Sequence, residues 1–564
     1  MKDVKDIDLN NPLPYIFVAF ILSSFFYKTY TSDRLLAITI VSGFLCLLLF
    51  YKGIVVSLLI TFFFFVGLFN NSLFYNYEPG NNEEIRIDTI KSYYVKGKIE
   101  GRYVYLDIDS DNLKVGDKVV AIGEFNKSLD LSKGIIGEYK VKNYKLLKKD
   151  FIGYLYDRRE SLYESIKSRL GKRKAGFITS VAFGYSEALD NEDREEMNIF
   201  GISHAISVSG LHMALVYGIL RRIFGCKISL FIALLYVLFT GASSSTVRSY
   251  IMIFIMSFAL VVKRNYNPLA SISLAGTILL LLHPYDLFSL GFELSFIATL
   301  GIIIFNKKLN KKLYKLPKRI REEVAVSISA QILTLPILIY SFNEFSINFL
   351  IGNIAILPII NILVLLGNLL LVFNKIIPIF NYLLYLCYCC IKAIDNVMDF
   401  FWDYKIDILY FNFTIAFFYS ILLITYYFYI KGYKRFIMLP IISLFYIFVL
   451  VYNPLPNIKY YKEGALLVSF RGENVLIQTK TLVDKAKLKK ITMSDKIYKE
   501  FNEIKIKDKI TIKKEGKHYK LETVKKEYML VVNKGKLDNE YDIIDFSTGK
   551  LQEVIIFDDK VISR

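Results

Sequence analysis

The hydrophobic pattern begins with three apolar runs joined by very short polar links. Residues 13–29, 35–50 and 54–74 each come close to the ~20 apolar residues that a helix needs to cross a bilayer. The pattern then changes, because residues 76–150 contain short runs of alternating polar and apolar positions, such as YVKGKIEG and KVVAIGEF. We therefore expect transmembrane helices within residues 1–75 and a soluble domain after them.

Residues 76–150 have the pattern of a small β-barrel. In LKVGDKVVAIGEF, a Gly-Asp turn leads into a run of valines, which predicts a hairpin of a compact five-stranded barrel. An oligonucleotide-binding (OB) fold fits this pattern, and such barrels hold single strands on a strand face and on loops. A barrel that only braces the membrane domain fits equally well.

Helical spacing returns in residues 151–198. Residues 151–171 place apolar side chains on one face and charges on the other, which predicts an amphipathic helix lying on the membrane or on the barrel. Residues 174–198 predict a second amphipathic segment.

Residues 199–454 form the main apolar region. Within it, residues 228–240 are short for a full span and predict half of a broken helix, while residues 391–407 predict an interfacial helix with Trp402 at headgroup level. Further apolar helices are expected at residues 322–341, 347–373, 376–394, 411–430 and 436–452.

The last segment, residues 455–564, consists of short strands such as ALLVSF, NVLIQT and EVIIFDD. The predicted fold class is therefore a polytopic α-helical membrane protein with about 11–12 transmembrane helices, some of them broken. It carries an N-terminal OB-like β-barrel and a small β-rich C-terminal soluble segment.

Composition and charge add a topology to this picture. Hydrophobic residues make up 54% of the chain and the net charge is +19. Basic loops, the strongest at residues 307–321, alternate with loops that carry no basic residue, and Lys and Arg are retained on the cytoplasmic side. This places the barrel at 76–150 and the loops at 241–245 and 283–289 on the outer face of the plasma membrane. Counting spans forward puts residues 455–564 outside as well.

Several kinds of site are not expected. The five cysteines form no CxxC pair, so a disulfide framework or a thiolate zinc site is unexpected. The N-terminus, MKDVKDIDLNNPLP, is too acidic for the leader of a signal peptide. No GxxxxGK[ST] phosphate loop is present, and we predict no metal and no cofactor.

Polar groups nevertheless gather within the apolar region, at residues 198–222. The cluster consists of His204, Ser207, Ser209, Gly210 and His212, within nine positions. Polar groups at membrane depth must face a protein interior or a watery cavity, so we predict that this cluster lines a functional path. The alternative is that small residues and hydroxyls only let the helices pack closely.

A second constellation is GASSSTVRSYIM at residues 241–252. Ser243 and Ser244 run into a helix whose second turn carries Arg248, an arginine with apolar neighbours. Hydroxyls and N–H groups at a helix N-terminus attract anions, and a buried arginine pairs naturally with phosphate. An ion pair from Arg248 to Glu293 or Asp286 is the structural alternative.

Two further stretches contain polar groups within apolar surroundings. In HPYDLFSLGFELSFIATLG, Asp286 and Glu293 bracket a turn with no adjacent nucleophile, which favours an architectural or pore-lining role. In residues 330–360, Gln331, Pro336 and Asn353 are among the residues expected to interrupt two helices and expose amides to a cavity. Proline kinks satisfied by their neighbours are the alternative there.

Taken together, SHAISVSGLHMALV, TGASSSTVRSYIM, HPYDLFSLGFELSFIATLG, QILTLPILIYSF and GNIAILP resemble successive signature blocks of the ComEC family of competence DNA-uptake channels. The resemblance covers roughly residues 175–370. It departs from the family in two places. A serine, Ser243 or Ser244, replaces the usual proline of the GAS segment. Residues 455–564 lack the HxHxDH zinc motif of the metallo-β-lactamase-like domain that ends many members.

The resemblance implies a membrane channel that passes single-stranded DNA into the cytoplasm during natural transformation. A surface DNA receptor and a cytoplasmic helicase-like ATPase are implied partners besides the DNA and the lipid bilayer. Degradation of the second strand would require a separate nuclease, because a two-metal nuclease needs several His and Asp ligands. His204, Ser209, Gly210, His212, Arg248, Asp286, Glu293 and Gln331 match positions within the family's motifs.

Two rival functions stay open. An intramembrane serine protease would pair Ser209 with His283, although no third orienting group or oxyanion donor is evident in the sequence. A structural membrane protein would use the same polar motifs only to pack helices. Apart from the serine-protease alternative, we do not expect the protein to be an enzyme.

Overall fold

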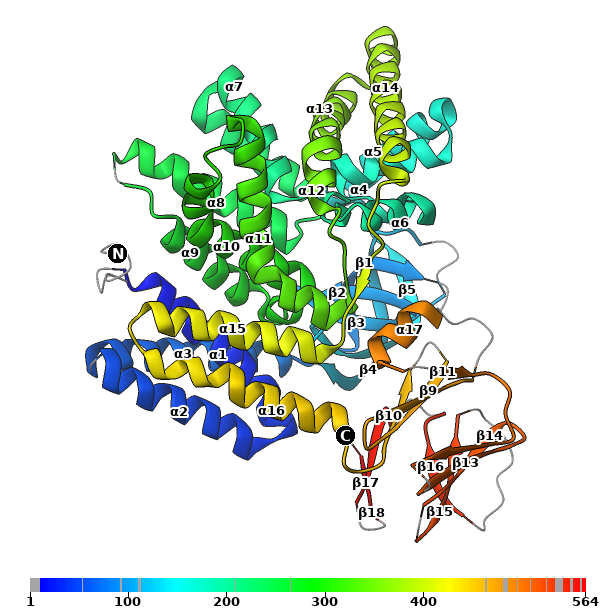
Figure 1. The fold of residues 1–564 in the computed structure, drawn as a ribbon. Coiled ribbons are helices and arrows are strands. Elements are labelled where there is room, and N and C mark those ends of the chain that lie inside the picture. Colours follow the sequence, from blue (N-terminus) through cyan, green and yellow to red (C-terminus); the bar gives the residue numbers. More distant parts are fainter. Residues whose placement is uncertain are drawn as a thin grey trace. The chain divides into compact units, whose positions relative to one another are not determined.

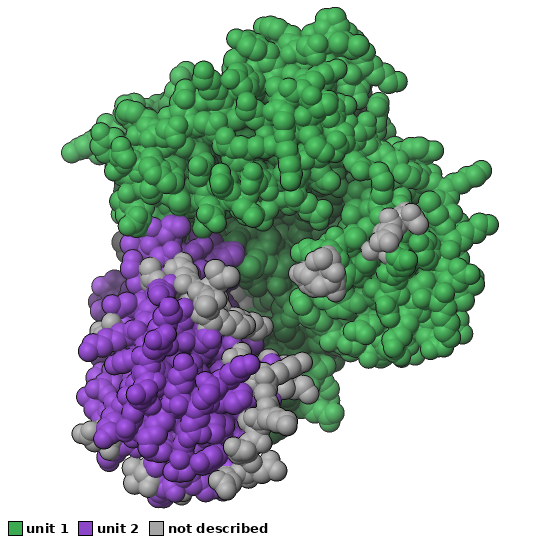
Figure 2. Space-filling view, turned by 90° about the vertical axis from the view of Figure 1, so that its right-hand side faces the viewer, with its two compact units in different colours: residues 1–334, 346–407 green, residues 335–345, 408–564 purple. Residues whose placement is uncertain are grey.

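The computed structural model describes most of the chain. The described ranges are 11–52, 54–91, 94–109, 113–206, 208–263, 265–461, 464–479, 485–494, 496–507, 509–523, 525–532, 541–547, 551–557 and 560–563. The chain divides into two compact units, coloured separately in Figure 2. Unit 1 contains residues 1–334 and 346–407, and unit 2 contains residues 335–345 and 408–564.

Unit 1 contains a closed five-stranded barrel, visible in Figure 1. Its strands are β1 (Asn82–Lys91), β2 (Tyr94–Ile99), β3 (Arg102–Asp107), β4 (Lys118–Asp130) and β5 (Ile135–Leu146). They close in the order β1-β2-β3-β5-β4, in which only β3 and β5 pair in parallel. Burial alternates along the strands, so apolar side chains fill the interior. The predicted OB-like barrel is confirmed.

The N-terminal membrane helices pack closely through small residues. They are α1 (Leu13–Ser32), α2 (Arg34–Lys52) and α3 (Ile54–Tyr75). A Cβ on Gly67 of α3 would lie 2.1 Å from Ser23 Oγ of α1, and Asn71 Nδ2 donates to Ser24 Oγ at 3.2 Å. Close backbone approach and interhelical hydrogen bonds hold helices together where lipid offers no hydrophobic drive.

The region after the barrel corrects one prediction. Its helices are α4 (Phe151–Leu170), α5 (Lys172–Phe183) and α6 (Asn191–Ile199). The second amphipathic segment, expected over residues 174–198, is divided between α5 and α6, and every residue from Ala175 to Phe183 is buried. The helix α5 is thus a core element, because it is largely apolar on all sides over these residues.

Helix α7 (Gly210–Phe239) folds back on itself at Gly225, whose φ of 73° and ψ of −177° are not helical. Val208, just before α7, and Thr240, just after it, lie close together. A Cβ on Gly184 would be 3.7 Å from Val208 Cγ2 and 3.8 Å from Thr240 O. A straight helix of this length would separate them by roughly 45 Å. The helix is therefore a hairpin of two halves, as the short segment 228–240 predicted.

The remaining helices of unit 1 complete the membrane domain (Figure 1). They are α8 (Ser244–Val261), α9 (Pro268–Leu282), α10 (Leu290–Lys312), α11 (Lys318–Phe342, which continues into unit 2), α12 (Phe349–Ile351), α13 (Leu357–Phe373) and α14 (Ile377–Trp402). A 3-10 turn, η3 (Pro284–Phe288), joins α9 to α10, and a π-helical turn, η4 (Gly352–Ile356), joins α12 to α13.

Two expectations about these helices were wrong. Pro336 does not interrupt α11, because the helix continues through Gln331 and Pro336 and stops only at Asn343, whose φ is 56°. The predicted interfacial helix at 391–407 is not separate, because residues 391–402 continue α14 up to Trp402.

Unit 2 combines two apolar helices with a β-sandwich. Helices α15 (Phe413–Ile430) and α16 (Met438–Tyr452) precede it, and the short strands β6 (Glu344–Phe345) and β7 (Leu409–Tyr410) pair with each other. One sheet has the order β11-β10-β9-β8-β17-β18 and the other β12-β13-β14-β15-β16. Side chains such as Val468 and Leu521 form the shared core. The predicted β-rich C-terminal segment is confirmed.

The bounds of the sandwich elements follow the predicted strand pattern. They are β8 (Asn457–Tyr461), β9 (Ala465–Phe470), β10 (Glu473–Gln478), α17 (Lys485–Thr492), β11 (Lys496–Tyr498), β12 (Glu503–Ile506), β13 (Ile510–Glu515), β14 (His518–Glu522), β15 (Glu527–Val531), β16 (Asp542–Asp545), β17 (Glu553–Phe557) and β18 (Lys560–Ser563). Arg471 and Gly472 join β9 to β10 with positive φ angles of 48° and 81°, as a two-residue hairpin turn requires.

Among the described residues, ten helices are long and apolar enough to cross a membrane, and Arg34–Cys46 and Pro268–Leu282 are shorter apolar helices. These lengths confirm a polytopic α-helical membrane protein.

Candidate functional site

The first two turns of α7, α8 and α10 meet in unit 1. A Cβ on Gly210, the first residue of α7, would lie 2.9 Å from Ser249 Oγ of α8. Ser295 Oγ of α10 donates to Ser245 Oγ of α8 at 3.2 Å. The positive ends of three helix dipoles are therefore close together, which favours negative charge at this point. We call this region the three-helix N-terminal site.

Serines form the N-caps of these helices. Ser243 Oγ accepts the N–H of Thr246 at 3.4 Å, and Ser289 Oγ accepts the N–H of Phe292 at 3.2 Å. Ser209 precedes α7 with extended backbone. A short hydroxyl side chain replaces the missing intrahelical acceptor for a first-turn N–H, so these serines fix where each helix begins. Ser243 of the candidate set thus has a structural task, and it is exposed.

Arg248 lies at the centre of the site and is 6% exposed. Its Nε donates to Ser295 Oγ at 2.9 Å, and its Nη1 donates to Thr299 Oγ1 at 2.8 Å. Nη2 lies 3.2 Å from the position that a Cβ on Gly210 would take. The guanidinium is thus held by neutral hydroxyls and keeps its full charge in a largely dry place.

The predicted ion pair from Arg248 is wrong. Within the described part of the chain, no carboxylate lies within ion-pair distance of Arg248. Glu293 lies in the first turn of α10, half-buried, and the cation that acts on it electrostatically is Lys28 of α1. Hydroxyls replace the expected carboxylate, so the positive charge of Arg248 stays available to another anion.

His212 lies one turn into α7 and is fully buried. Its Nδ1 accepts the backbone N–H of Ser209 at 3.3 Å, so in the neutral ring Nε2 carries the proton. Nε2 is buried and has no hydrogen-bond partner among the described residues. A buried donor without an acceptor costs about 1–3 kcal/mol, so this N–H is a candidate ligand group.

The serine-protease arrangement is not assembled. His283 lies beside Tyr285, with ring centroids 5.5 Å apart, and no hydrogen bond joins it to Ser209 in the described residues. The histidine that contacts Ser209 is His212, and it does so through the backbone N–H of Ser209.

Asp286 connects the site to the barrel. It lies in η3 and is 8% exposed, its side chain bonds to Ser244, and Lys98 of β2 lies near enough to act on it. Burial raises the pKa of Asp286 to about 6, although Ser244 and Lys98 oppose the rise. A loop carboxyl is therefore poised to titrate beside the first residue of α8.

Tyr285, next to Asp286, docks the barrel on η3. Its ring belongs to the barrel core, 5.7 Å from the Phe74 ring and 5.5 Å from the Tyr103 ring. Burial raises the pKa values of both Tyr103 and Tyr285. The barrel, the loop at 283–289 and the start of α8 therefore lie on one side of the membrane domain, as the charge pattern predicted.

The outer face of β2 and β3 near this contact is basic and aromatic. Lys96 Nζ lies 3.9 Å from the ring centroid of Tyr103, and Lys98 Nζ lies 5.0 Å from it. The rings of Tyr94 and Tyr105 meet edge to face at 5.6 Å. These side chains are half-buried and alternate with the barrel core. Surfaces that bind single-stranded nucleic acid combine aromatic rings, on which the bases stack, with cations that pair with the phosphates.

Other candidates are not part of this site. Gln331 Oε1 accepts from Thr334 Oγ1 at 3.1 Å, and Asn353 Nδ2 donates to Ser327 Oγ at 3.0 Å, next to the π-helical turn η4. His204 is exposed in the 3-10 turn Ser203–Ala205. Ser207 lies outside the described residues.

Sequence reasoning missed the hydroxyls that hold Arg248. Ser295 and Thr299 are four residues apart on α10, as Ser245 and Ser249 are on α8. This spacing puts each pair on one helix face, and it is the signal that could have identified them. Among the described residues, no group of three or more His, Cys, Asp or Glu side chains could hold a metal ion.

Comparisons with known proteins cover the part of the chain that contains this site. Residues 181–433 match the family described as "Competence protein". The chain is 28% identical over 220 residues to "ComE operon protein 3" of Bacillus subtilis, and the match covers 37% of this chain and 28% of that protein. It is 24% identical over 230 residues to "Recombination protein 2" of Haemophilus influenzae, covering 36% and 29%.

An uncharacterized protein of Aquifex aeolicus is 26% identical over 275 residues, covering 43% of this chain and 64% of that protein. The chain thus spans less than two thirds of each of these relatives. No solved structure matches the chain. The motifs, the membrane fold and the family match agree: residues 181–433 of this chain are a competence domain similar to that of the ComEC-type competence proteins.

Proposed function

We propose that this protein takes up DNA during competence, as a channel that passes one DNA strand into the cytoplasm. The observation that supports this most is Arg248, a buried arginine without a carboxylate partner among the described residues, at the meeting point of three helix N-termini. Phosphate is the anion that such a guanidinium and such dipole ends suit best.

The proposed path begins on the barrel. The strand is received by the basic and aromatic face of β2 and β3, on the same side as η3. It then passes Asp286 and reaches the three-helix N-terminal site, where the free edge of Arg248 and the Nε2–H of His212 are available to phosphate oxygens. Each contact is a single charge or donor, so the strand is held weakly enough to move on.

We also propose an orientation and a set of partners for the channel. The barrel and the C-terminal sandwich face outward in this scheme, as the basic loops predict. A surface receptor delivers the DNA, a separate nuclease removes the second strand, and a cytoplasmic helicase-like ATPase supplies the energy, since the sequence contains no phosphate loop.

Uptake of end-labelled double-stranded DNA tests the proposal, with surface-bound and nuclease-protected label scored separately. Cells carrying Arg248→Ala are expected to bind DNA normally and to lose protected label by tenfold or more, because one charge-assisted contact is worth about 1.5–3 kcal/mol. Lys315→Ala, which removes an exposed cation from the loop after α10, is the matched control and should leave uptake unchanged.

Arg248→Lys separates transport from packing. A lysine keeps the charge but cannot donate to Ser295 and Thr299 in the planar geometry of a guanidinium, so uptake is expected to fall between wild type and Arg248→Ala. If Arg248→Ala lowers the melting temperature but leaves protected label intact, the residue only packs helices and the channel proposal fails at this site.

A further inference from the structure

The tip of the α7 hairpin is cationic. The half of α7 before Gly225 has room for about 15 residues, or roughly 22 Å, whereas a hydrocarbon core is ~30 Å thick. Arg221, Arg222 and Lys227 flank the turn and are all exposed. The tip of this short hairpin therefore carries three exposed positive charges.

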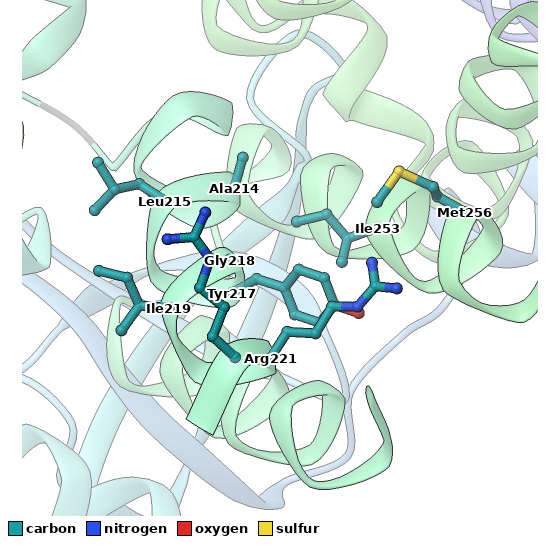
Figure 3. Close-up of a pocket in the computed structure, with 9 residues that line it drawn as sticks. Ala214, Leu215, Tyr217, Gly218, Ile219, Arg221, Ile253 and Met256 are labelled. Carbon is teal, nitrogen blue, oxygen red and sulfur yellow. The ribbon is translucent and has the colours of Figure 1, made fainter. Parts of the chain in front are cut away.

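A groove opens beside this tip. Its volume is about 600 Å³, and it lies between the first half of α7 and α8. Figure 3 shows the residues that line it. Its walls are mostly apolar, with Leu215, Ile219, Ile253 and Met256 among the lining residues, and Arg221 and Arg222 complete the lining. One region thus combines a surface suited to a hydrocarbon chain with two guanidinium groups.

Gly218 leaves room on the α7 side of the groove. A Cβ at this position would meet no atom within 4 Å. The groove is firmly built, because Tyr217 and Ser257 join α7 to α8 through a hydroxyl–hydroxyl bond of 2.6 Å beside it. The space is therefore a feature of two fixed helices.

The two arginines lack anions within the protein. Among the described residues, neither Arg221 nor Arg222 forms an ion pair. Charges close to the hydrocarbon region extend toward the headgroups and pair there, and basic pockets between membrane helices on the cytoplasmic side suit anionic headgroups. Single-stranded DNA has no long alkyl chain, so the apolar walls favour a lipid.

We propose that this groove is a binding site for an anionic phospholipid. One acyl chain lies along Leu215, Gly218, Ile253 and Met256, and the headgroup phosphate lies between Arg221 and Arg222. The lipid supplies the negative charge that the hairpin tip lacks and fixes the depth of the hairpin in the cytoplasmic leaflet. This inference does not depend on DNA transport.

The test uses the full chain in phosphatidylcholine nanodiscs, with and without phosphatidylglycerol. Native mass spectrometry counts the phosphatidylglycerol retained after detergent extraction, and a thermal melt reports the stabilisation that it provides. Wild type is expected to retain phosphatidylglycerol over phosphatidylcholine. Arg221→Gln with Arg222→Gln should weaken retention by roughly five-fold for each arginine removed.

Gly218→Leu is a second variant that distinguishes loss of the lipid site from misfolding. The new side chain has space, and leucine favours a helix more than glycine does, so the variant should fold as well as wild type and still lose retained lipid. Lys307→Gln with Lys308→Gln is the matched control, because it removes two exposed cations from α10 without touching the groove.

Three outcomes overturn the proposal: equal retention of the two lipids by wild type, unchanged retention in both groove variants, or equal loss in the Lys307 and Lys308 control. Protection of the groove by a single-stranded oligonucleotide in lipid-free detergent, lost in the arginine variants, would assign the site to DNA instead. DNA uptake is scored separately, so failure here leaves the channel proposal untouched.

Discussion

At Arg248 the protein keeps a full positive charge beside three helix N-termini and surrounds it with hydroxyls. Repulsion from the helix dipoles and loss of water both disfavour such a charge. Two good hydrogen bonds, at 2.9 and 2.8 Å, offset only part of this cost. The charge of Arg248 is therefore only partly compensated, and an anion that binds there would stabilise it. The neighbouring side chains decide how easily an anion can reach the guanidinium.

Gly210 is one of those neighbours. A side chain at this position would push against Ser249 Oγ at 2.9 Å and Arg248 Nη2 at 3.2 Å. We expect Gly210→Val to cost about 1–3 kcal/mol in folding free energy and to displace the guanidinium, which lowers DNA uptake. Thermal melts and protected-label uptake measure both effects.

Gly291→Ala is the control for Gly210, because it adds a Cβ in the first turn of α10 where no atom lies within 4 Å. Equal behaviour of the two variants would contradict the role of close packing at Gly210.

Asp286 gives a pH signature at the residue scale. Its pKa in the folded state is about 6, whereas the ordinary value of an aspartate is 3.8. Between pH 3.8 and pH 6, the folded protein therefore binds more protons than the unfolded chain. Stability contributed by the neutral form is therefore lost as pH rises from about 4 to about 6, by at most about 3 kcal/mol. Asp286→Asn should remove this loss.

Melting temperature measured across pH checks the prediction. Asp286→Asn is expected to match wild type near pH 4 and to exceed it near pH 7. Glu195→Gln, at an exposed position of α6, should show the wild-type profile. A wild-type melting temperature that rises between pH 4 and pH 6 relative to Asp286→Asn would refute the assignment.

At the scale of elements, the β2–β3 face of the barrel resembles a nucleic-acid platform that is anchored at one end. Tyr103 is bound to Tyr285 of η3, whereas Tyr94 and Tyr105 lie farther along the strands and are half-exposed. Docking through η3 therefore leaves part of the face open.

Tyr105→Ala should weaken binding of a labelled oligothymidine to the full chain by about tenfold, because stacking of one base on a ring is worth ~1–3 kcal/mol. Fluorescence anisotropy with the protein in nanodiscs provides the measurement. Tyr154→Ala is the control, since Tyr154 is an exposed tyrosine of α4 outside the barrel. If both variants bind like wild type, the barrel only braces the membrane domain.

For the whole molecule, the local patterns predicted the elements better than their partners. Alternating residues predicted the barrel, and the short apolar segment 228–240 predicted a broken helix, because periodicity and length are written locally. The partner of Arg248 was not predictable in this way. Opposite charge suggested Glu293, but the approach of α8 to α10 selected Ser295 and Thr299.

Two misjudged elements share a cause. Residues 174–198 were expected to form one amphipathic segment, of which α5 is the first part, and Pro336 was expected to interrupt a helix. In both cases packing by distant segments decides the outcome: other helices bury α5 on every side, and an apolar environment favours a continuous helix even across a proline.

The order of strands in the C-terminal sandwich has a consequence for biosynthesis. Strand β8 pairs on one side with β9, which follows it at once, and on the other with β17, in the register Lys459 to Glu553. During translation the edge of β8 therefore stays unpaired until nearly a hundred further residues have left the ribosome. During that interval the exposed N–H and C=O groups of β8 can pair with strands of other chains. Slow synthesis of this stretch, or loss of a chaperone that covers it, should therefore increase the aggregation of nascent chains. It should not destabilise protein that has already folded.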